Sequence, residues 1–220
     1  MDLNARYFLL LVDISNSTGL AGKKFNMKMD MLESSLKIMN DTHKSELVLP
    51  LTISYGDEIA GLFNAPGNIF KIVAEIRGVF HPLTTIRFAV TKGNIARISQ
   101  DIRKVGGNIF KVASESVNRL KQDDRFCSWQ MGDIILDKAL DSLCEISNAL
   151  LNDMSEYQSK VFDLYKTGLS QRQVALKLKK YPQSVWNAVH RGKANHILNA
   201  EETINMILQN INDNWLILQK

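Results

Sequence analysis

Cysteine is scarce in this chain: Cys127 and Cys144 are the only two among 220 residues. Two cysteines form at most one bridge, which excludes a small secreted scaffold held by disulfides. Long apolar runs are also missing. The longest run near the N-terminus, residues 7–12, is far too short for a membrane span, and no signal-like basic segment precedes it. We expect a cytoplasmic protein in a reducing compartment, with no membrane partner.

Internal repeats and low-complexity stretches are absent as well, and the balance of 23% charged and 45% apolar residues excludes a disordered or collagen-like chain. The length predicts one or two domains. Charge is unevenly distributed: residues 1–156 hold 18 Lys and Arg against 19 Asp and Glu, whereas residues 157–193 hold 8 against 1. A near-neutral body with a basic tail is typical of a protein that contacts nucleic acid through the tail. A solvated basic face is the alternative.

Hydrophobic periodicity predicts an α+β fold for residues 1–150. The expected strands are residues 7–12, 47–55, 58–63 and 83–91, and the expected helices are residues 19–44, 68–80, a segment after Gly106-Gly107, and 134–150. This order fits a ferredoxin-like βαββαβ core, an antiparallel sheet with helices on one face. Pro50 indicates that the second strand lies at an edge or contains a bulge. Residues 151–220 form the expected second domain, which is all-α and ends in a closing helix.

Methionines follow helical spacing in the first predicted helix. Met27, Met31 and Met39 recur at three- and four-residue steps together with Leu32 and Leu36. Methionine fills irregular gaps in apolar cores, so we interpret these side chains as core filling rather than as a ligand set.

Two carboxylates occupy matching places in this predicted topology. Asp13 follows the first strand, and Asp57 lies at the tip of the hairpin between the second and third strands. Because the first strand lies beside the hairpin, the two side chains can converge and hold Mg²⁺ or Mn²⁺ while leaving room for phosphate oxygens. The main-chain N–H groups of residues 15–19 would open a helix and receive phosphate. The structural alternative is a helix cap at Asp13 and a turn residue at Asp57.

Four segments in order resemble class III nucleotide cyclases. Residues 12–20 resemble their first metal motif and residues 55–58 their second, which is also similar to the Gly-Asp-Glu turn of diguanylate cyclases and palm domains. Residues 86–93 resemble a later strand, and residues 107–114 resemble the start of the helix that carries catalytic residues. The resemblance implies metal ligation by Asp13, Ile14 and Asp57, and nucleotide binding by Ser15, Asn16, Ser17, Thr18, Gly56 and Lys111.

One departure from the cyclase pattern bears on catalysis. Cyclases carry an Asn and, four residues later, an Arg on that last helix, where this chain has Lys111 and Glu115. A glutamate there would repel a triphosphate and remove stabilisation of the charge that develops during phosphoryl transfer. Nucleotide binding is therefore a better-supported expectation than cyclisation.

The tail carries the pattern of a helix-turn-helix. Gly168 ends one predicted helix, Ser170 caps the next, and Gln183 or Ser184 is expected to open the third, with Trp186 in the core. Residues 168–175 resemble sigma-factor region 4, in which the third helix enters the major groove. The candidate DNA contacts are Gln183, Ser184, Asn187, His190, Arg191, Lys179 and Lys180. A protein-interaction or dimerisation module is the alternative.

The whole chain resembles the SatD family, which joins a cyclase-like or palm-like front to a helix-turn-helix. Three hypotheses follow. The first is a DNA-binding transcription regulator whose front domain binds a nucleotide and a divalent metal. The second is an active nucleotide cyclase or oligonucleotide synthase that uses Asp13 and Asp57 for two-metal catalysis. The third is a degenerate dimerisation scaffold. The cyclase resemblance also implies a homodimer.

Overall fold

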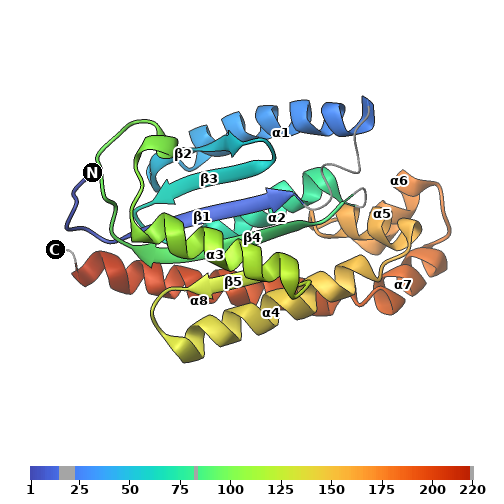
Figure 1. Cartoon of the computed structure of the whole chain (residues 1–220). Helices are drawn as coiled ribbons and strands as arrows, with labels where there is room; N and C mark the ends of the chain where they lie inside the picture. Colours follow the sequence, from blue (N-terminus) through green and yellow to red (C-terminus); the bar gives the residue numbers. More distant parts are fainter. Residues whose placement is uncertain (15–22, 82–83, 219–220) are drawn as a thin grey trace. The chain divides into compact units, whose positions relative to one another are not determined.

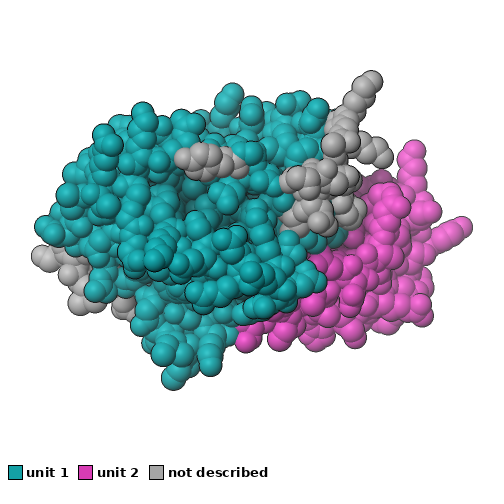
Figure 2. All heavy atoms as spheres, in the orientation of Figure 1, with its two compact units in different colours: residues 1–141, 205–220 teal, residues 142–204 magenta. Residues whose placement is uncertain are grey.

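The computed structural model describes residues 1–14, 23–81 and 84–218. The chain divides into two compact units, residues 1–141 with 205–220 and residues 142–204 (Figure 2). The boundary expected from the sequence, between residues 150 and 151, falls inside helix α4 (Ile134–Asn152). Within the described residues, no helix combines the length and apolar character needed to cross a membrane.

A five-stranded sheet forms the centre of the first unit (Figure 1). Its strands are β1 (Tyr7–Ile14), β2 (Leu47–Tyr55), β3 (Glu58–Phe63), β4 (Ile86–Gly93) and β5 (Cys127–Gln130), in the order β2-β3-β1-β4-β5. β1 pairs antiparallel with both β3 and β4, β2 pairs antiparallel with β3, and β5 pairs parallel with β4. The expected mixed α+β class is confirmed. Sequence analysis missed β5, because four residues are too few to establish a period.

Both faces of β1 are covered, and all eight of its residues are buried. Leu9 and Leu11 pack in one cluster with Ala113 and Val117 of α3 (Asn108–Gln122). Figure 1 shows α3 in front of the sheet and α2 (Ile69–Phe80) behind it. The sheet of the first unit therefore has helices on both faces, because α3, which follows the expected βαββαβ segment, covers the face opposite α2. A strand that is buried at every position, like β1, needs cover on both sides, and the helix after β4 supplies the second layer.

Helix α1 (Lys23–Thr42) buries only part of the methionine pattern. Leu32, Leu36 and Met39 are buried, whereas Met27 and Met31 are 55% and 47% exposed. At about 100° per residue, positions 27 and 31 lie on the side of the helix away from the Leu32 stripe. The interpretation of Met27 and Met31 as core filling was wrong, because the spacing permits two faces and only packing selects one.

The edge strand β2 is irregular. Its pairing with β3 shifts register three times, between Leu47 and Leu49, between Leu49 and Thr52, and between Ile53 and Tyr55. Pro50 lies in the second of these shifts, so the prediction that this proline marks an edge or a bulge is confirmed.

Four helices follow α4 among the described residues: α5 (Glu156–Tyr165), α6 (Gln171–Leu178), α7 (Pro182–Arg191) and α8 (Ala194–Leu218). Ser170 caps α6 and exchanges hydrogen bonds with Gln173 in a capping box, as its sequence position predicted. Helix α7 begins at Pro182, earlier than the expected Gln183 or Ser184. The difference has a physical reason, because a proline in the first helical position lacks only an N–H that would be unsatisfied there.

Candidate functional site

Asp13 is a buried acid at the end of the central strand, with 3% of its surface exposed. Its Cα pairs with that of Glu58 in β3 and with that of Arg87 in β4. Side chains directly opposite one another in an antiparallel sheet share a face, so these three charged groups lie on one face of the sheet. Since Leu11, two residues earlier, packs with α3, this is the face that α3 covers.

Lys121, in the last turn of α3, supplies the cation for Asp13. Its Nζ lies 2.7 Å from Oδ1 of Asp13. Sequence analysis missed Lys121, although a signal existed. The residues Ile109, Ala113 and Val117 form a stripe at four-residue spacing that packs on the sheet, and Lys121 is the next position in this stripe.

Glu58 is the second carboxyl of the cluster. Burial raises the pKa of Glu58 above its ordinary value, the negative charges of Asp13 and Asp57 raise it further, and the ammonium of Lys121 acts in the opposite direction. The pKa of Glu58 therefore responds to both Asp13 and Lys121. The sequence motif contained Glu58 but assigned it no role.

Arg87 is the member of the cluster that lies on β4. Its guanidinium donates to Oδ1 of Asp124 at 2.8 Å. Asp124 lies two residues after the end of α3 and has a φ of 50°. The end of α3 is thus tied to the sheet at two points, through Lys121 to β1 and through Asp124 to β4.

The remaining predicted metal and nucleotide residues of the hairpin and β1 have these places. Asp57 and Gly56 form the two-residue loop between β2 and β3, and Gly56 has a φ of 55°. Asp57 is therefore at the hairpin tip, as predicted. Ile14 ends β1 with a buried side chain. The predicted nucleotide ligands Ser15, Asn16, Ser17 and Thr18 lie outside the described residues.

Lys111 lies at the other end of α3. It pairs with Glu115 at 3.9 Å, and Glu115 also contacts Arg119 at 3.8 Å, in a row on the exposed side of the helix. Lys111 and Lys121 are separated by about 15 Å along the axis, at a rise of about 1.5 Å for each residue. The structure therefore does not bring Lys111 to Asp13.

A divalent cation at Asp13 would find few protein ligands. Among the described residues, no three His, Cys, Asp or Glu side chains gather as a metal-binding group. Magnesium sites that use one or two carboxylates are completed by water and by substrate phosphates. Asp13 and Glu58 fit this kind of site, in which the cation arrives with a phosphorylated ligand and the protein holds it through carboxylate oxygens.

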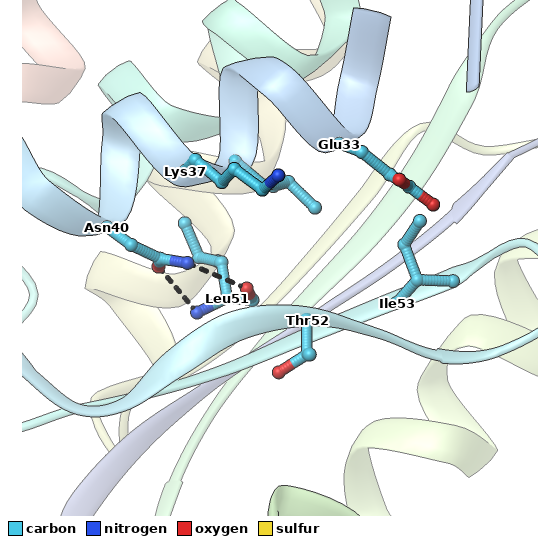
Figure 3. Close-up of a pocket in the computed structure, with 7 residues that line it drawn as sticks. Glu33, Lys37, Asn40, Leu51, Thr52 and Ile53 are labelled. Atoms are coloured by element: carbon cyan, nitrogen blue, oxygen red, sulfur yellow. Dashed lines mark hydrogen bonds between the residues drawn. The ribbon is translucent and has the colours of Figure 1, made fainter. Parts of the chain in front are cut away.

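A pocket of about 360 Å³ lies elsewhere in the first unit, between α1 and β2 (Figure 3). The lining residues are Glu33, Leu36, Lys37, Asn40, Leu51, Thr52 and Ile53. The Asn40 amide donates to the Leu51 carbonyl at 3.0 Å and accepts from the Leu51 N–H at 2.8 Å. These two bonds satisfy the backbone N–H and carbonyl of Leu51 in the edge strand β2, so the role of Asn40 is structural.

The second unit presents a polar surface on α7. Gln183, Asn187 and His190 recur at three- and four-residue spacing on the side opposite the buried Val185 and Val189. Ser184 and Arg191 flank this row. All five predicted base-contacting residues therefore lie on the outward half of one helix.

Two lysines precede this face of α7 in the chain. Lys179 ends α6 in the left-handed conformation with a φ of 51°, and Lys180 follows it in the turn before α7. Both are exposed, and the structure gives neither an ion-pair partner among the residues it describes. By contrast, Lys160 on α5 is paired with Glu156 at 2.6 Å.

Trp186 lies on the same outward face and is 44% exposed. Its ring stacks on that of His190 with centroids 4.0 Å apart, and Nδ1 of His190 bonds to the Trp186 carbonyl at 3.0 Å. The expectation that Trp186 belongs to the core was wrong. Val185 and Val189 already fill the inward side of α7, which leaves position 186 outside.

This chain was compared with known proteins by structure and by sequence. The structural alignment with a bacterial light-regulated adenylyl cyclase covers 57% of this chain and 75% of the cyclase chain. Its TM-score is 0.41, and the sequence identity is 14%. A search of curated proteins found no match. The sequence model of the SatD family matches residues 7–197. This match covers most of the chain and spans both compact units, so the protein belongs to the SatD family.

Proposed function

We propose that this protein is a DNA-binding transcription regulator whose first unit binds a nucleotide together with Mg²⁺ or Mn²⁺. In this proposal, α6 and α7 form a helix-turn-helix and α7 enters the major groove. The observation that carries it is the outward face of α7, where Gln183, Asn187 and His190 follow the exposed lysines of the preceding turn. Amide and imidazole groups read base edges, and lysines bind phosphates without sequence preference.

The salt dependence of DNA binding tests this placement. We would measure binding of the full chain to a random-sequence duplex by fluorescence anisotropy at several salt concentrations. Each phosphate contact contributes about 0.9 to the slope of log affinity against log salt. Lys180→Gln is expected to weaken binding and to lower that slope by about 0.9. Lys160→Gln is the matched control, because Lys160 is already paired on α5.

Two results would contradict the helix-turn-helix assignment. One is an absence of DNA binding at low salt by the folded protein. The other is equal loss of affinity in the Lys160 and Lys180 variants, which would indicate attraction by net charge rather than contact through the turn. Arg191→Ala is also expected to weaken binding, since Arg191 is exposed at the end of α7.

For the first unit, we propose a ferredoxin-like core of the cyclase and palm type. The strand order β2-β3-β1-β4, antiparallel throughout, supports this assignment. Asp13 and Glu58 would hold the divalent cation, and Asp57 at the hairpin tip would add negative charge nearby. A ligand that binds one arrangement of the two units more tightly would shift the protein toward it and so change DNA affinity.

Incubation with Mn²⁺ and each of the four nucleoside triphosphates tests the first unit, with binding followed by calorimetry and products by mass spectrometry. We expect metal-dependent binding without a product, and loss of binding in Asp13→Ala. A cyclic or oligomeric product that the variant fails to make would favour a cyclase or an oligonucleotide synthase. If the folded protein neither binds nor converts any of the four, the dimerisation scaffold becomes the better interpretation.

A further inference from the structure

We propose that Lys121 is a positioning residue of the nucleotide site: its ammonium neutralises Asp13 and passes to a phosphate group of the nucleotide when a divalent cation binds. This inference rests on the proposed nucleotide and metal function of the first unit. It concerns a residue outside the segments that resemble cyclase motifs, and it follows from the contact between α3 and β1.

The two partners of this ion pair differ in their freedom to move. The Asp13 side chain is 4% exposed and belongs to the central strand, whereas the Lys121 side chain is 43% exposed and lies one residue before the end of α3. A buried carboxylate that loses its partner retains the full cost of desolvation, whereas a half-exposed ammonium can regain water. Lys121 is therefore the partner that can leave.

A divalent cation and the ammonium compete for the same atom. Nζ of Lys121 lies 2.7 Å from Oδ1 of Asp13, so a divalent cation bound to this carboxylate would stand close to the ammonium. Two cations in contact with one carboxylate oxygen would repel each other strongly in a partly buried site. Binding of a divalent cation to Asp13 therefore favours withdrawal of the ammonium.

The charge balance of the cluster favours a phosphate as the new partner. With the carboxylates ionised, Asp13, Glu58, Asp57 and Lys121 together carry two negative charges, and the Arg87–Asp124 pair adds none. A divalent cation neutralises this total but leaves an excess of positive charge at Asp13 and Lys121. An anionic polyphosphate compensates that charge, and a lysine side chain is a flexible point cation suited to it. Lys111 cannot take this role from its position, because it lies at the opposite end of α3 and pairs with Glu115.

Two titrations with opposite expected signs test the proposal. The first measures Mn²⁺ binding without nucleotide from the electron paramagnetic resonance signal of free Mn²⁺. Lys121→Gln is expected to bind Mn²⁺ about tenfold more tightly than wild type, because a competing charged hydrogen bond of this kind is worth about that factor. The second measures binding of each of the four nucleoside triphosphates by calorimetry at saturating Mn²⁺. There Lys121→Gln is expected to bind about tenfold more weakly, because a contact between a cation and phosphate is lost.

Two further variants separate this role from a structural one. Lys111→Gln removes the same charge from the same helix and is expected to change neither titration. Lys121→Arg retains a cation and is expected to behave like wild type in the Mn²⁺ titration. Circular dichroism and thermal unfolding would confirm that each variant is folded. If Lys121→Gln does not fold, Lys121→Met takes its place in both titrations with the same expected directions, because it also removes the charge.

The outcomes distinguish this inference from the proposed function. If wild type binds Mn²⁺ and a nucleotide but Lys121→Gln matches it in either titration, the role of Lys121 is overturned and the nucleotide site remains. The same holds if both affinities change in the same direction, because a structural defect would produce that result. If folded wild type and Lys121→Gln both bind neither probe, the proposed function of the first unit fails, and this inference fails with it.

Discussion

Asp13 in β1 and Glu58 in β3 face each other directly across the sheet, on the side that α3 covers. Two carboxyl groups in such a position are costly when both are ionised, because each opposes the charge of the other. Lys121 offsets this cost at Asp13. The arrangement makes the stability of the first unit depend on pH.

The pKa of Glu58 is raised above 4.5, first by burial and then by Asp13. The folded protein therefore binds the Glu58 proton more tightly than the unfolded chain does, so stability falls as pH rises through the folded-state pKa. Glu58→Gln removes this loss of stability, because glutamine does not titrate. We expect its free energy of unfolding, relative to wild type, to increase from about pH 4.5 to about pH 7 in urea titrations. A difference in unfolding free energy between Glu58→Gln and wild type that stays constant with pH would contradict the prediction. Glu75→Gln, on the exposed side of α2, is the control.

Gly107 is expected to be intolerant of a side chain. It precedes α3 with a φ of 114°, and a Cβ there would lie 2.8 Å from the backbone nitrogen of Ala96. Gly107→Ala should destabilise the first unit by about 2 kcal/mol or more, because backbone strain and a backbone clash combine. Gly78→Ala is the matched comparison. Gly78 is helical with nothing within 4 Å of its Cβ position, so alanine should stabilise by about 0.5–1 kcal/mol. Urea unfolding of both variants checks the difference in sign.

Lys179 occupies a position that favours glycine. Its φ of 51° and ψ of 47° are left-handed, as at many helix ends. A left-handed non-glycine residue costs about 1–2 kcal/mol, part of which the greater freedom of glycine in the unfolded chain cancels. Lys179→Gly should therefore raise stability by up to about 1 kcal/mol and, under the proposed function, weaken DNA binding. Thermal unfolding and anisotropy measure the two effects. Parallel changes of stability and DNA affinity would contradict this account.

Trp186 and Val185 are adjacent on α7 but should respond differently to alanine. Val185 is fully buried in the core of the second unit, so Val185→Ala should cost about 2 kcal/mol of unfolding free energy. Trp186→Ala should cost less than about 1 kcal/mol, because the ring is half exposed and stacks only on His190 among the aromatic contacts described. Under the proposed function, Trp186→Ala is expected to have a larger effect on DNA affinity than on stability. Equal destabilisation by the two variants would place Trp186 in the core after all.

Local patterns predicted most elements of the fold. Residues 47–55 and 58–63 are strands with the expected bounds, and Ser170 caps α6 as its spacing from Gln173 indicated. The strand β5 escaped prediction because it has only four residues and is held by its pairing with β4. The exposure of Trp186 escaped it because a helical period does not say which of two faces turns inward.

The charged cluster shows the same division. The sequence by itself determined that Asp13 ends a buried strand and that Asp57 lies in a tight turn, because apolar runs and turn residues act over a few positions. Only the tertiary structure decided that Glu58 faces Asp13 and that Lys121 neutralises it. Strand register and the packing of α3 on the sheet bring together residues far apart in the chain. The stripe at four-residue spacing places Lys121 on the sheet side of α3, but it does not specify which residue of the sheet Lys121 contacts.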